Sequence, residues 1–256
     1  SRGGKFDSVL MYSLQMGLRD YLSKPITESD IQEAKAFFAL HGEPFNEAGW
    51  RRILNVYGGY LPIKINAVPE GTLVPVGVPM VSVSCVDPKL YWLASYVETW
   101  LLRAVWYGST VATNSFMCKR VIKKYLEETG DVSGLPFKLH DFGARGVSSQ
   151  ESAMIGGSAH LVNFMGSDTL EGIWAANYYY RCGMSGFSIP ALEHSVTTAW
   201  GKDREEECMR NALEVWGGKD KFMACVSDTY DIFNAVENIW GEKLKDEVVK
   251  NGATVV

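Results

Sequence analysis

Residues 140–152, HDFGARGVSSQES, place an aspartate, an aromatic ring, an arginine and two glycines directly before a predicted helix start. Ser148 and Glu151 have the spacing of a capping box, so we expect the helix to begin near Ser149. The free backbone N–H groups of its first turn would point back at the loop, where they favour a phosphate. The segment is therefore a candidate for binding an anion beside a flat ring.

The loop itself supports two interpretations. Gly143 and Gly146 would allow positive φ angles and a close approach of the backbone to a ligand, and Arg145 could hold an anion with two charge-assisted hydrogen bonds. A tight turn between strand and helix, with the arginine paired to a neighbouring carboxylate, accounts for the same residues. From this loop alone both interpretations stay open.

Polar residues also follow three later strand-like segments. They include Asp168, the pair Glu193-His194, and Asp228. If these strands are parallel neighbours in a (β/α) barrel, their carboxyl ends share one face, and that face holds the active site. Asp168 and Asp228 could instead be helix N-caps, and a lone histidine such as His194 is more often a packing or surface residue. Together with the loop within 140–152, four loops with polar residues would then meet on one face, and this is the physical argument for an enzyme.

The other histidines carry less weight. His41 is expected on the surface and His160 inside a helix as a structural residue, whereas His140 lies within a strand and could be either. Zinc-binding spacings and the H-E-x-x-H, Walker A and G-x-S-x-G motifs do not occur in the sequence, which argues against a metallohydrolase, an NTPase or an esterase. Asp-Phe-Gly also occurs in kinases, but none of the companion kinase motifs is present.

The second half of the chain alternates strand-like and helical patterns. We predict strands within 137–142, 161–166, 186–191, 222–228 and 253–256, and helices within 148–162, 168–183, 192–217 and 229–250. Such alternation predicts parallel strands with covering helices. The predicted fold class is α/β, with residues 131–256 forming the first part of an irregular, unclosed (β/α) barrel. A doubly wound sheet is the alternative.

Residues 1–130 have a different pattern and are predicted to form a partial α+β flanking domain. We expect helices over 7–22 and 26–42, the second with Thr27 and Asp30 as competing caps. Short β-branched runs punctuated by proline and glycine predict antiparallel strands within 61–87. A buried helix over 90–108 and an amphipathic one over 110–130, closed by Gly130, complete this half.

The composition limits the class of protein. The chain has 256 residues, 46% of them hydrophobic, and a net charge of −5, which argues against a surface that coats nucleic acid or anionic membrane. Five cysteines without a C-x-x-C pair indicate reduced thiols in an intracellular, cytoplasmic protein. No apolar run approaches the roughly 18 residues that span a bilayer. The non-methionine start and the terminal KNGATVV, a strand with no evident continuation, suggest a fragment.

The sequence closely resembles the nicotinamide phosphoribosyltransferases, which are type II phosphoribosyltransferases. The resemblance runs from the first helices to the last residue. Its most specific carriers are KLHDFGARGVSSQES, GGSAHLVNFMGSDTLEG, SIPALEHSVTTAWGKD and VSDTYDIFNAVENIWG, supported by FNEAGW and LPIKINAVPEGTLVPVG. It implies an enzyme that joins nicotinamide to 5-phosphoribosyl-1-pyrophosphate, giving nicotinamide mononucleotide and pyrophosphate in NAD salvage.

The resemblance also implies roles for residues around the base. Phe142 stacks on the pyridine ring, and Arg145 lies beside the ring and the product's phosphate. Asp168 accepts a hydrogen bond from the carboxamide nitrogen and repels the carboxylate of nicotinate. Ser188 and Ala191 line the tunnel behind the base.

The remaining implied roles concern phosphate chemistry and assembly. His194 is the residue that ATP transiently phosphorylates, and Asp228 lies near the ribose and phosphates. Mg²⁺ is expected on the substrate pyrophosphate, held largely by substrate oxygens and water. A homodimer with sites at the interface is implied, and a Trp-rich helix within 92–106 fits such an interface.

Two departures from the family pattern bear on activity. Ala144 stands where some members carry an aromatic residue. The family also continues past this segment into an Arg-Pro-Asp-Ser-Gly motif and a Gly-rich phosphate loop, and begins earlier with a tyrosine that reaches the partner's site. The alternatives are a nicotinate phosphoribosyltransferase, or a non-catalytic fragment that binds the base or dimerises.

Overall fold

The computed structural model describes residues 3–256. The chain divides into two compact units, the first ending at Phe187 and the second comprising Ser188–Val256. The division predicted from the sequence, between residues 130 and 131, stays a prediction.

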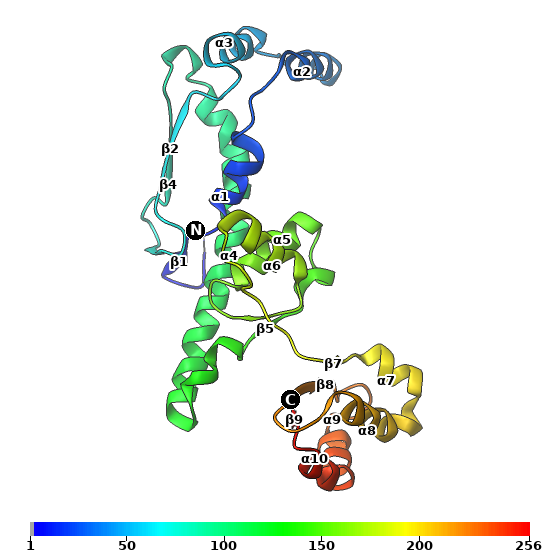
Figure 1. The fold of residues 1–256 in the computed structure, drawn as a ribbon. Helices are drawn as coiled ribbons and strands as arrows, with labels where there is room; N and C mark the ends of the chain where they lie inside the picture. Colours follow the sequence, from blue (N-terminus) through cyan, green and yellow to red (C-terminus); the bar gives the residue numbers. More distant parts are fainter. Residues whose placement is uncertain (1–2) are drawn as a thin grey trace. The chain divides into compact units, whose positions relative to one another are not determined.

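The first unit combines short strands with helices of very different length (Figure 1). Its strands are β1 (Ser8–Leu10), β2 (Ile63–Ala67), β3 (Leu73–Pro75), β4 (Val81–Cys85), β5 (His140–Asp141) and β6 (Gly166–Ser167). Its α-helices are α1 (Leu14–Gly17), α2 (Glu28–His41), α3 (Glu47–Tyr57), α4 (Leu93–Thr129), α5 (Gln150–His160) and α6 (Leu170–Tyr180). It also has a π-helix, η1 (Leu18–Leu22), and the 3₁₀-helices η2 (Pro88–Leu90), η3 (Val132–Phe137) and η4 (Gly143–Gly146).

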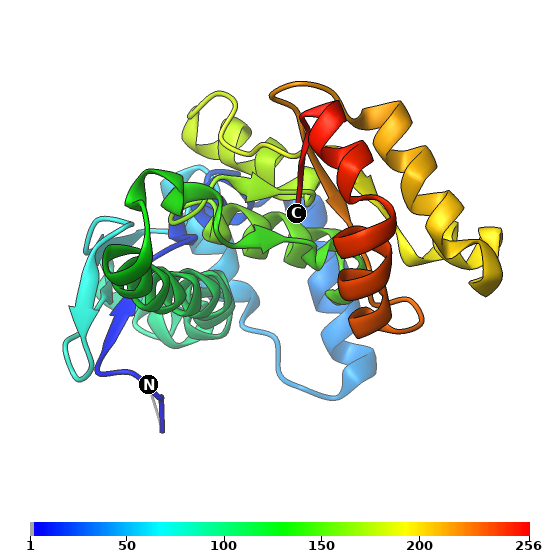
Figure 2. The ribbon, with the colours of Figure 1, turned by 90° about the horizontal axis from the view of Figure 1, so that it is seen from below.

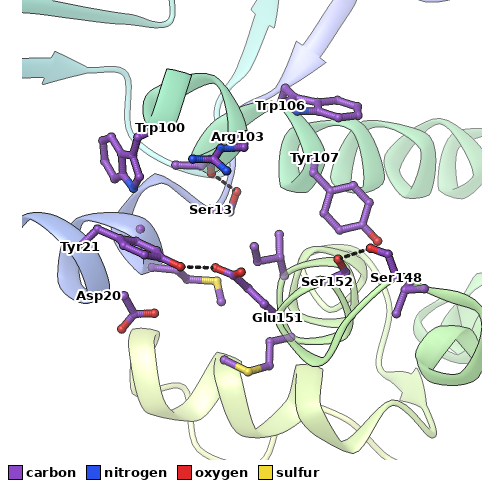
Figure 3. A pocket seen from close by; sticks show the side chains of 16 residues that line it. Ser13, Asp20, Tyr21, Trp100, Arg103, Trp106, Tyr107, Ser148, Glu151 and Ser152 are labelled. Atoms are coloured by element: carbon purple, nitrogen blue, oxygen red, sulfur yellow. Dashed lines mark hydrogen bonds between the residues drawn. The ribbon is translucent and has the colours of Figure 1, made fainter. Parts of the chain in front are cut away.

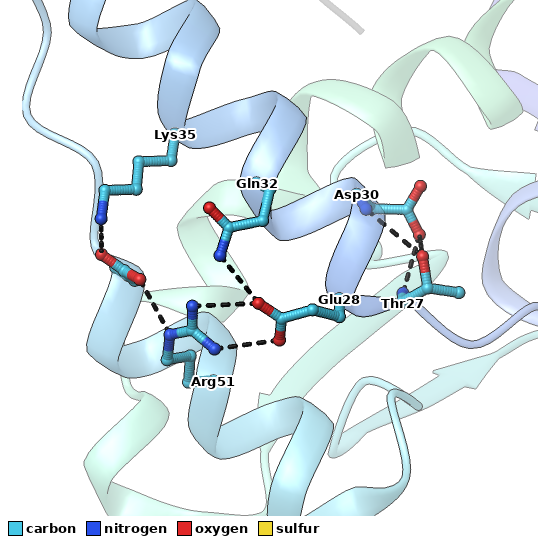
Figure 4. Close-up of polar contacts among 7 residues, drawn as sticks. Thr27, Glu28, Asp30, Gln32, Lys35 and Arg51 are labelled. Atoms are coloured by element: carbon cyan, nitrogen blue, oxygen red, sulfur yellow. Dashed lines mark hydrogen bonds and ion pairs between the residues drawn. The ribbon is translucent and has the colours of Figure 1, made fainter.

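Helix α2 starts where its capping residues predict. Thr27 accepts a hydrogen bond from the backbone N–H of Asp30, whose carboxylate accepts one from the backbone N–H of Thr27. The two residues therefore form one capping box rather than competing caps. Arg51 of α3 reaches back to Glu28 with both terminal guanidinium nitrogens, at 2.9 and 3.0 Å, and joins the two helices (Figure 4).

The N-terminal strands pair antiparallel, β1 with β3 and β2 with β4, as predicted for the segment 61–87. The helix predicted over 7–22 is wrong in its first part, because residues 8–10 form β1 against residues 73–75. The backbone N–H of Leu10 also donates to Thr113 Oγ1 of α4, at 2.9 Å. These distant partners outweigh the local helical pattern.

Helix α4 has 37 residues and runs through the first unit (Figure 1). The sequence predicts two helices here, over 90–108 and 110–130, so that expectation is corrected to one continuous helix. Gly108 lies inside this helix, where a Cβ would collide with the Ser13 side chain, so the glycine lets the segment before α1 approach closely. The buried face of α4 changes partners along its length, from α3 and η2 to β1 and then α5.

Helices α5 and α6 pack closely beside each other (Figure 1). Small residues allow this: Gly157 of α5 faces Gly172 of α6, and Gly156 accommodates the Tyr107 hydroxyl from α4. The short strands that precede these helices, β5 and β6, pair in parallel. His160 is buried at the end of α5 and bonds to the carbonyl of Gly166 at 3.0 Å, which confirms its structural role.

The second unit is built from three parallel strands and their helices. Its strands are β7 (Ala191–Leu192), β8 (Phe222–Cys225) and β9 (Thr254–Val255), in the order β7-β8-β9. Its helices are α7 (His194–Trp200), the 3₁₀-helix η5 (Lys202–Arg204), α8 (Glu205–Trp216), α9 (Ile232–Asn234), the π-helix η6 (Ala235–Lys243) and α10 (Lys245–Asn251). Figure 2 shows the helices of this unit, coloured yellow to red, beside β8.

A single apolar cluster holds this unit together. Met209 and Leu213 of α8 pack with Met223 of β8, Ile239 and Leu244, and each of these five side chains is buried. The parallel pairing predicted for the second half is confirmed in both units. The observed class is a mixed α/β structure with small sheets, and the closed or unclosed barrel stays a proposal.

Candidate functional site

The loop after β5 is held by its own aspartate. Asp141 Oδ1 accepts a hydrogen bond from the backbone N–H of Gly143 at 2.8 Å. A Cβ on Gly143 would lie 2.9 Å from the same oxygen, so this close approach requires glycine. Neither Gly143 nor Gly146 has a positive φ, which corrects the expectation of left-handed backbone. The turn places Phe142 just before η4 and Arg145 within it.

Phe142 and Asp168 lie at the same end of the β5–β6 pair. The parallel register sets Asp141 beside Ser167, and the backbone N–H of Asp168 donates to the Asp141 carbonyl at 2.9 Å. Each of the two side chains contacts His140. The imidazole stacks on the Phe142 ring with centroids 4.5 Å apart and planes inclined by 28°, and His140 Nε2 lies 3.3 Å from Asp168 Oδ2.

The exposure of these groups suits ligand binding. Phe142 is 62% exposed although its ring packs on His140, so it retains area for a second ring. The Asp168 side chain is 40% exposed and uses one of its oxygens toward His140. Asp168 is not the N-cap of α6; that position belongs to Thr169. The alternative interpretation of Asp168 as a cap is therefore wrong, and its carboxylate can accept hydrogen bonds from a ligand.

Helix α5 begins one residue after the position predicted. Ser149 is the N-cap and accepts a hydrogen bond from the backbone N–H of Ser152 at 3.1 Å. The predicted capping box of Ser148 and Glu151 does not form, because the Ser148 hydroxyl lies 3.0 Å from that of Ser152. Glu151 instead accepts a hydrogen bond from the Tyr21 hydroxyl at 3.0 Å. Three serine hydroxyls thus surround the start of α5.

Two ionisable groups near this loop have shifted pKa values. Burial, and secondarily the charge of Asp141, raise the pKa of Tyr107. Burial lowers the pKa of His160, against a weaker opposing effect of its hydrogen bond to Gly166. The uncharged forms of Tyr107 and His160 are therefore favoured.

A pocket of about 690 Å³ lies beside this loop in the first unit (Figure 3). Its walls come from α1, η1, α4, α5 and the loop before α5, with Trp100, Arg103, Trp106 and Tyr107 on one side and Ser148, Glu151 and Ser152 on another. Phe142, Arg145 and Asp168 do not line it. This pocket was not predictable from the sequence, because its aromatic residues fit the pattern of a buried helix.

In the second unit, His194 is held between two neighbours. Its Nδ1 lies 3.1 Å from Thr229 Oγ1, and its Nε2 lies 3.6 Å from Asp228 Oδ1. The parallel pairing of β7 with β8 brings the two loops side by side. The side chains of His194 and Asp228 are both more than half exposed, at 58% and 65%. The imidazole is oriented by two groups yet open to a substrate.

Asp228 does not cap a helix either. The N-cap of α9 is Asp231, whose side chain accepts a hydrogen bond from the backbone N–H of Asn234 at 3.1 Å. This corrects the alternative interpretation of Asp228. Thr229 is a further residue at this site that was not predicted from the sequence. Its signal was a hydroxyl directly after the strand-end aspartate in the segment S-D-T.

The remaining predicted residues lie at the start of the second unit. Ser188 is exposed, and its hydroxyl lies 3.4 Å from the carbonyl of Ile189. Ala191 is exposed and opens β7, where it pairs with Ala224.

The structure thus groups the predicted residues in two sets. The first unit holds Phe142, Arg145 and Asp168, and the second holds Ser188, Ala191, His194 and Asp228. That the two sets form one site stays a prediction.

Two further observations concern metals and membranes. Among residues 3–256, no group of three or more His, Cys, Asp or Glu side chains is arranged to hold a metal ion. In the same part of the chain, every helix is too short or too polar to cross a bilayer.

Comparison with protein-family models gives two matches. Residues 137–255 match the nicotinate phosphoribosyltransferase (NAPRTase) family, and residues 1–65 match the N-terminal domain of nicotinamide phosphoribosyltransferase. The two matches do not overlap. The first 65 residues and most of the second half of the chain are therefore each similar to a part of a nicotinate or nicotinamide phosphoribosyltransferase.

Curated relatives agree with the family models. A nicotinamide phosphoribosyltransferase of Xanthomonas campestris pv. campestris is 49% identical over 258 residues, covering 100% of this chain and 55% of the relative. One from Acinetobacter baylyi is 36% identical over 255 residues, covering 95% of this chain and 50% of the relative. The chain spans about half the length of these relatives. A crystal structure of human nicotinic acid phosphoribosyltransferase matches with a TM-score of 0.49 and 22% identity over 75% of this chain and 33% of that chain.

Proposed function

This chain belongs to the nicotinate and nicotinamide phosphoribosyltransferase family of enzymes, and we propose that the gene product containing it makes nicotinamide mononucleotide. The reaction joins nicotinamide to 5-phosphoribosyl-1-pyrophosphate, and pyrophosphate leaves. The observation that carries the proposal is the meeting of Phe142 and Asp168 on His140 at one strand end. A flat apolar wall and an acceptor carboxylate are what a pyridine carboxamide needs.

The chemistry of the transfer fits these groups. As pyrophosphate leaves, the ribosyl carbon gains oxocarbenium character, so catalysis consists mainly of orienting the base and stabilising charge. Phe142 would stack on the pyridine ring, and Asp168 would accept a hydrogen bond from the carboxamide N–H. Because Asp168 is negatively charged, it would repel the carboxylate of nicotinate. We therefore propose nicotinamide as the preferred base.

Several groups would act on the phosphates. Arg145 in η4 and the N–H groups at the start of α5 would hold the phosphate beside the base, as helix N-termini commonly do. Asp228 would lie near the ribose and phosphates. Mg²⁺ would enter bound to the pyrophosphate of the substrate rather than on a resident protein site.

We also propose that His194 couples ATP hydrolysis to synthesis. Its Nε2 would attack the γ-phosphoryl group, ADP would leave, and the phosphoryl group would later pass to water. Thr229 at Nδ1 fixes the ring orientation, and Asp228 near Nε2 stabilises the positive charge that develops on the imidazole. Ser188 and Ala191 would line the tunnel behind the base.

Assembly and fold complete the proposal. We propose a type II phosphoribosyltransferase barrel of which this chain contributes the first strands, and a homodimer. Exposed aromatic side chains on α4, such as Tyr96 at 51% and Trp106 at 59%, support an interface on that helix.

The test is a product assay with the gene product that contains this chain. Nicotinamide, 5-phosphoribosyl-1-pyrophosphate and Mg²⁺ should give nicotinamide mononucleotide, detected by chromatography, with nicotinate as a much poorer substrate. Faster turnover of nicotinate would support the nicotinate enzyme instead. Binding of nicotinamide in calorimetry without any turnover would indicate a non-catalytic base-binding protein.

A further inference from the structure

His140 lies in a narrow space between Phe142, Asp168 and the neighbouring strand β6. Its ring stacks on Phe142, and a Cβ on Gly166 would lie 2.7 Å from its Nδ1, so only a glycine in the neighbouring strand leaves room for the imidazole. Its Nε2 is buried and makes no aligned hydrogen bond, although Asp168 Oδ2 lies 3.3 Å away. The ring is therefore fixed in position, with one polar atom directed at one carboxylate.

We propose that His140 is a positioning residue that sets base specificity through Asp168. This inference rests on the proposed function, because it assigns the specificity of the same site. His140 engages Oδ2 of Asp168, which leaves Oδ1 to accept the carboxamide N–H of the base. At the same time, the imidazole supports the Phe142 ring from one side.

The surroundings explain why a histidine serves here. A buried polar nitrogen without a partner is costly, so Nε2 and the Asp168 carboxylate hold each other in place. The other titratable groups close to this space are Asp141, on the same strand, and His160, which bonds to the Gly166 carbonyl. Neither contacts Asp168 through its side chain in the described hydrogen bonds and ion pairs of residues 3–256.

Two substitutions separate the functions of the ring. His140→Phe keeps an aromatic ring against Phe142 but removes the nitrogen that faces Asp168. His140→Gln keeps a side-chain N–H that can reach the carboxylate but removes the stacked ring. Both are compared in the gene product that contains this chain, with His41→Phe, at an exposed histidine of α2, as the matched control.

The readouts are steady-state constants for each substrate. His140→Phe should raise KM for nicotinamide about tenfold, because the nitrogen that faces Asp168 Oδ2 is lost and the carboxylate is no longer held in the orientation that the base requires. KM for 5-phosphoribosyl-1-pyrophosphate should stay within about twofold, and the ratio of kcat/KM for nicotinamide over nicotinate should fall about tenfold. His140→Gln should keep that ratio, and His41→Phe should match the wild type.

A double-mutant cycle tests whether His140 acts through Asp168. The combined His140→Phe and Asp168→Asn variant should lose no more selectivity than Asp168→Asn alone. If His140 acts only by orienting the Asp168 carboxylate, its removal has no further effect once that carboxylate is gone. Additive losses would overturn the inference, as would an unchanged selectivity in His140→Phe. If His140→Phe does not fold, a lost selectivity in folded His140→Gln would overturn it too. Failure of the proposed function is distinguishable, since the wild type would then form no nicotinamide mononucleotide.

Discussion

Gly157 and Gly172 bring the backbones of α5 and α6 into direct contact. A Cβ on Gly172 would lie 2.5 Å from the Cα of Gly157. The loop with Phe142 leads into α5, and Asp168 lies just before α6, so this contact helps to set the spacing of the two predicted base-binding residues. A small change at the glycine pair should therefore affect both the stability and the site.

Gly172→Ala should destabilise the protein by about 1–3 kcal/mol, the usual cost of overpacking a tight contact. The methyl group has no flexible neighbour to displace, because the atoms it meets are backbone. Urea denaturation followed by tryptophan fluorescence measures the change. Gly134→Ala is the control, since its nearest neighbour is the end of the Lys138 side chain at 3.4 Å. Equal midpoints for the two variants would contradict this account of the packing.

Asp168→Asn should weaken the preference for nicotinamide over nicotinate by at least about tenfold. The amide removes the charge that repels the nicotinate carboxylate and replaces one acceptor oxygen by a donor. The measurement is the ratio of kcat/KM for the two bases. Asp203→Asn, on the exposed 3₁₀-helix η5, is the matched control. An unchanged ratio in Asp168→Asn would remove Asp168 from the specificity site.

Thr229→Val should reduce the stimulation of synthesis by ATP more than the synthesis without ATP. The valine keeps the shape of threonine but cannot bond to His194 Nδ1, so the imidazole loses one of its two orienting contacts. Phosphorylation of His194 can be followed with γ-labelled ATP, and product formation in the same samples. Ser195→Ala serves as control, at the exposed neighbour of His194. Full labelling of Thr229→Val would show that the hydroxyl is not needed.

Asp87 predicts a pH dependence of stability. Its carboxylate accepts a hydrogen bond from the Lys89 backbone N–H and contacts Arg52 and Tyr57, and these interactions lower its pKa below the ordinary 3.8. Because the pKa is lower in the folded state, the stabilisation is complete well above pH 3.8 and is lost as the pH falls through that value toward the folded pKa.

Asp87→Asn should therefore lower the urea midpoint at pH 7 and flatten its decline between about pH 5 and pH 3. Urea titrations at a series of pH values measure both effects. Asp220→Asn, on an exposed turn residue, is the control. An Asp87→Asn variant that lost stability on acidification as steeply as the wild type would place the acid-sensitive group elsewhere.

The cysteines should fall into fast and slow classes toward iodoacetamide at pH 8. Cys118 and Cys182 are exposed, whereas Cys208 and Cys225 are buried. Burial raises the pKa of Cys208, and it raises that of Cys225 to about 11, so little reactive thiolate is present there. Peptide mapping by mass spectrometry, with and without urea, measures the rates. Labelling of Cys225 in the native protein as fast as Cys118 would contradict the buried position.

Much of the fold was predictable because its signals are local. The start of α2 at Thr27 and the antiparallel strands within 61–87 follow from residues close in sequence, and the parallel strands of the second half follow from its alternating strand and helix patterns. The strand β1 was not predictable in this way, because its partners are β3 and Thr113 on α4. The need for glycine at position 108 of α4 likewise depends on Ser13, which is far away in sequence and leaves no room for a Cβ.

The candidate site shows the same limit. The types of Phe142, Asp168 and His194 and their places after strands could be predicted from the sequence. The contacts of His140 could not, because they depend on the register that sets β5 beside β6. The contact of Thr229 with His194 could not be predicted either, because it depends on the pairing of β7 with β8.

The length of α4 has a consequence for how relatives of this chain can vary. Its 37 residues form a rod of about 55 Å whose faces contact α3, β1 and α5 in turn. Inserting one residue would rotate every later side chain by about 100° about the helix axis. The helix could then keep its contact with α3 only by losing its contact with α5, or the reverse. Insertions and deletions that evolution accepts inside this rod should therefore come in whole turns, and other length changes should gather at its two ends.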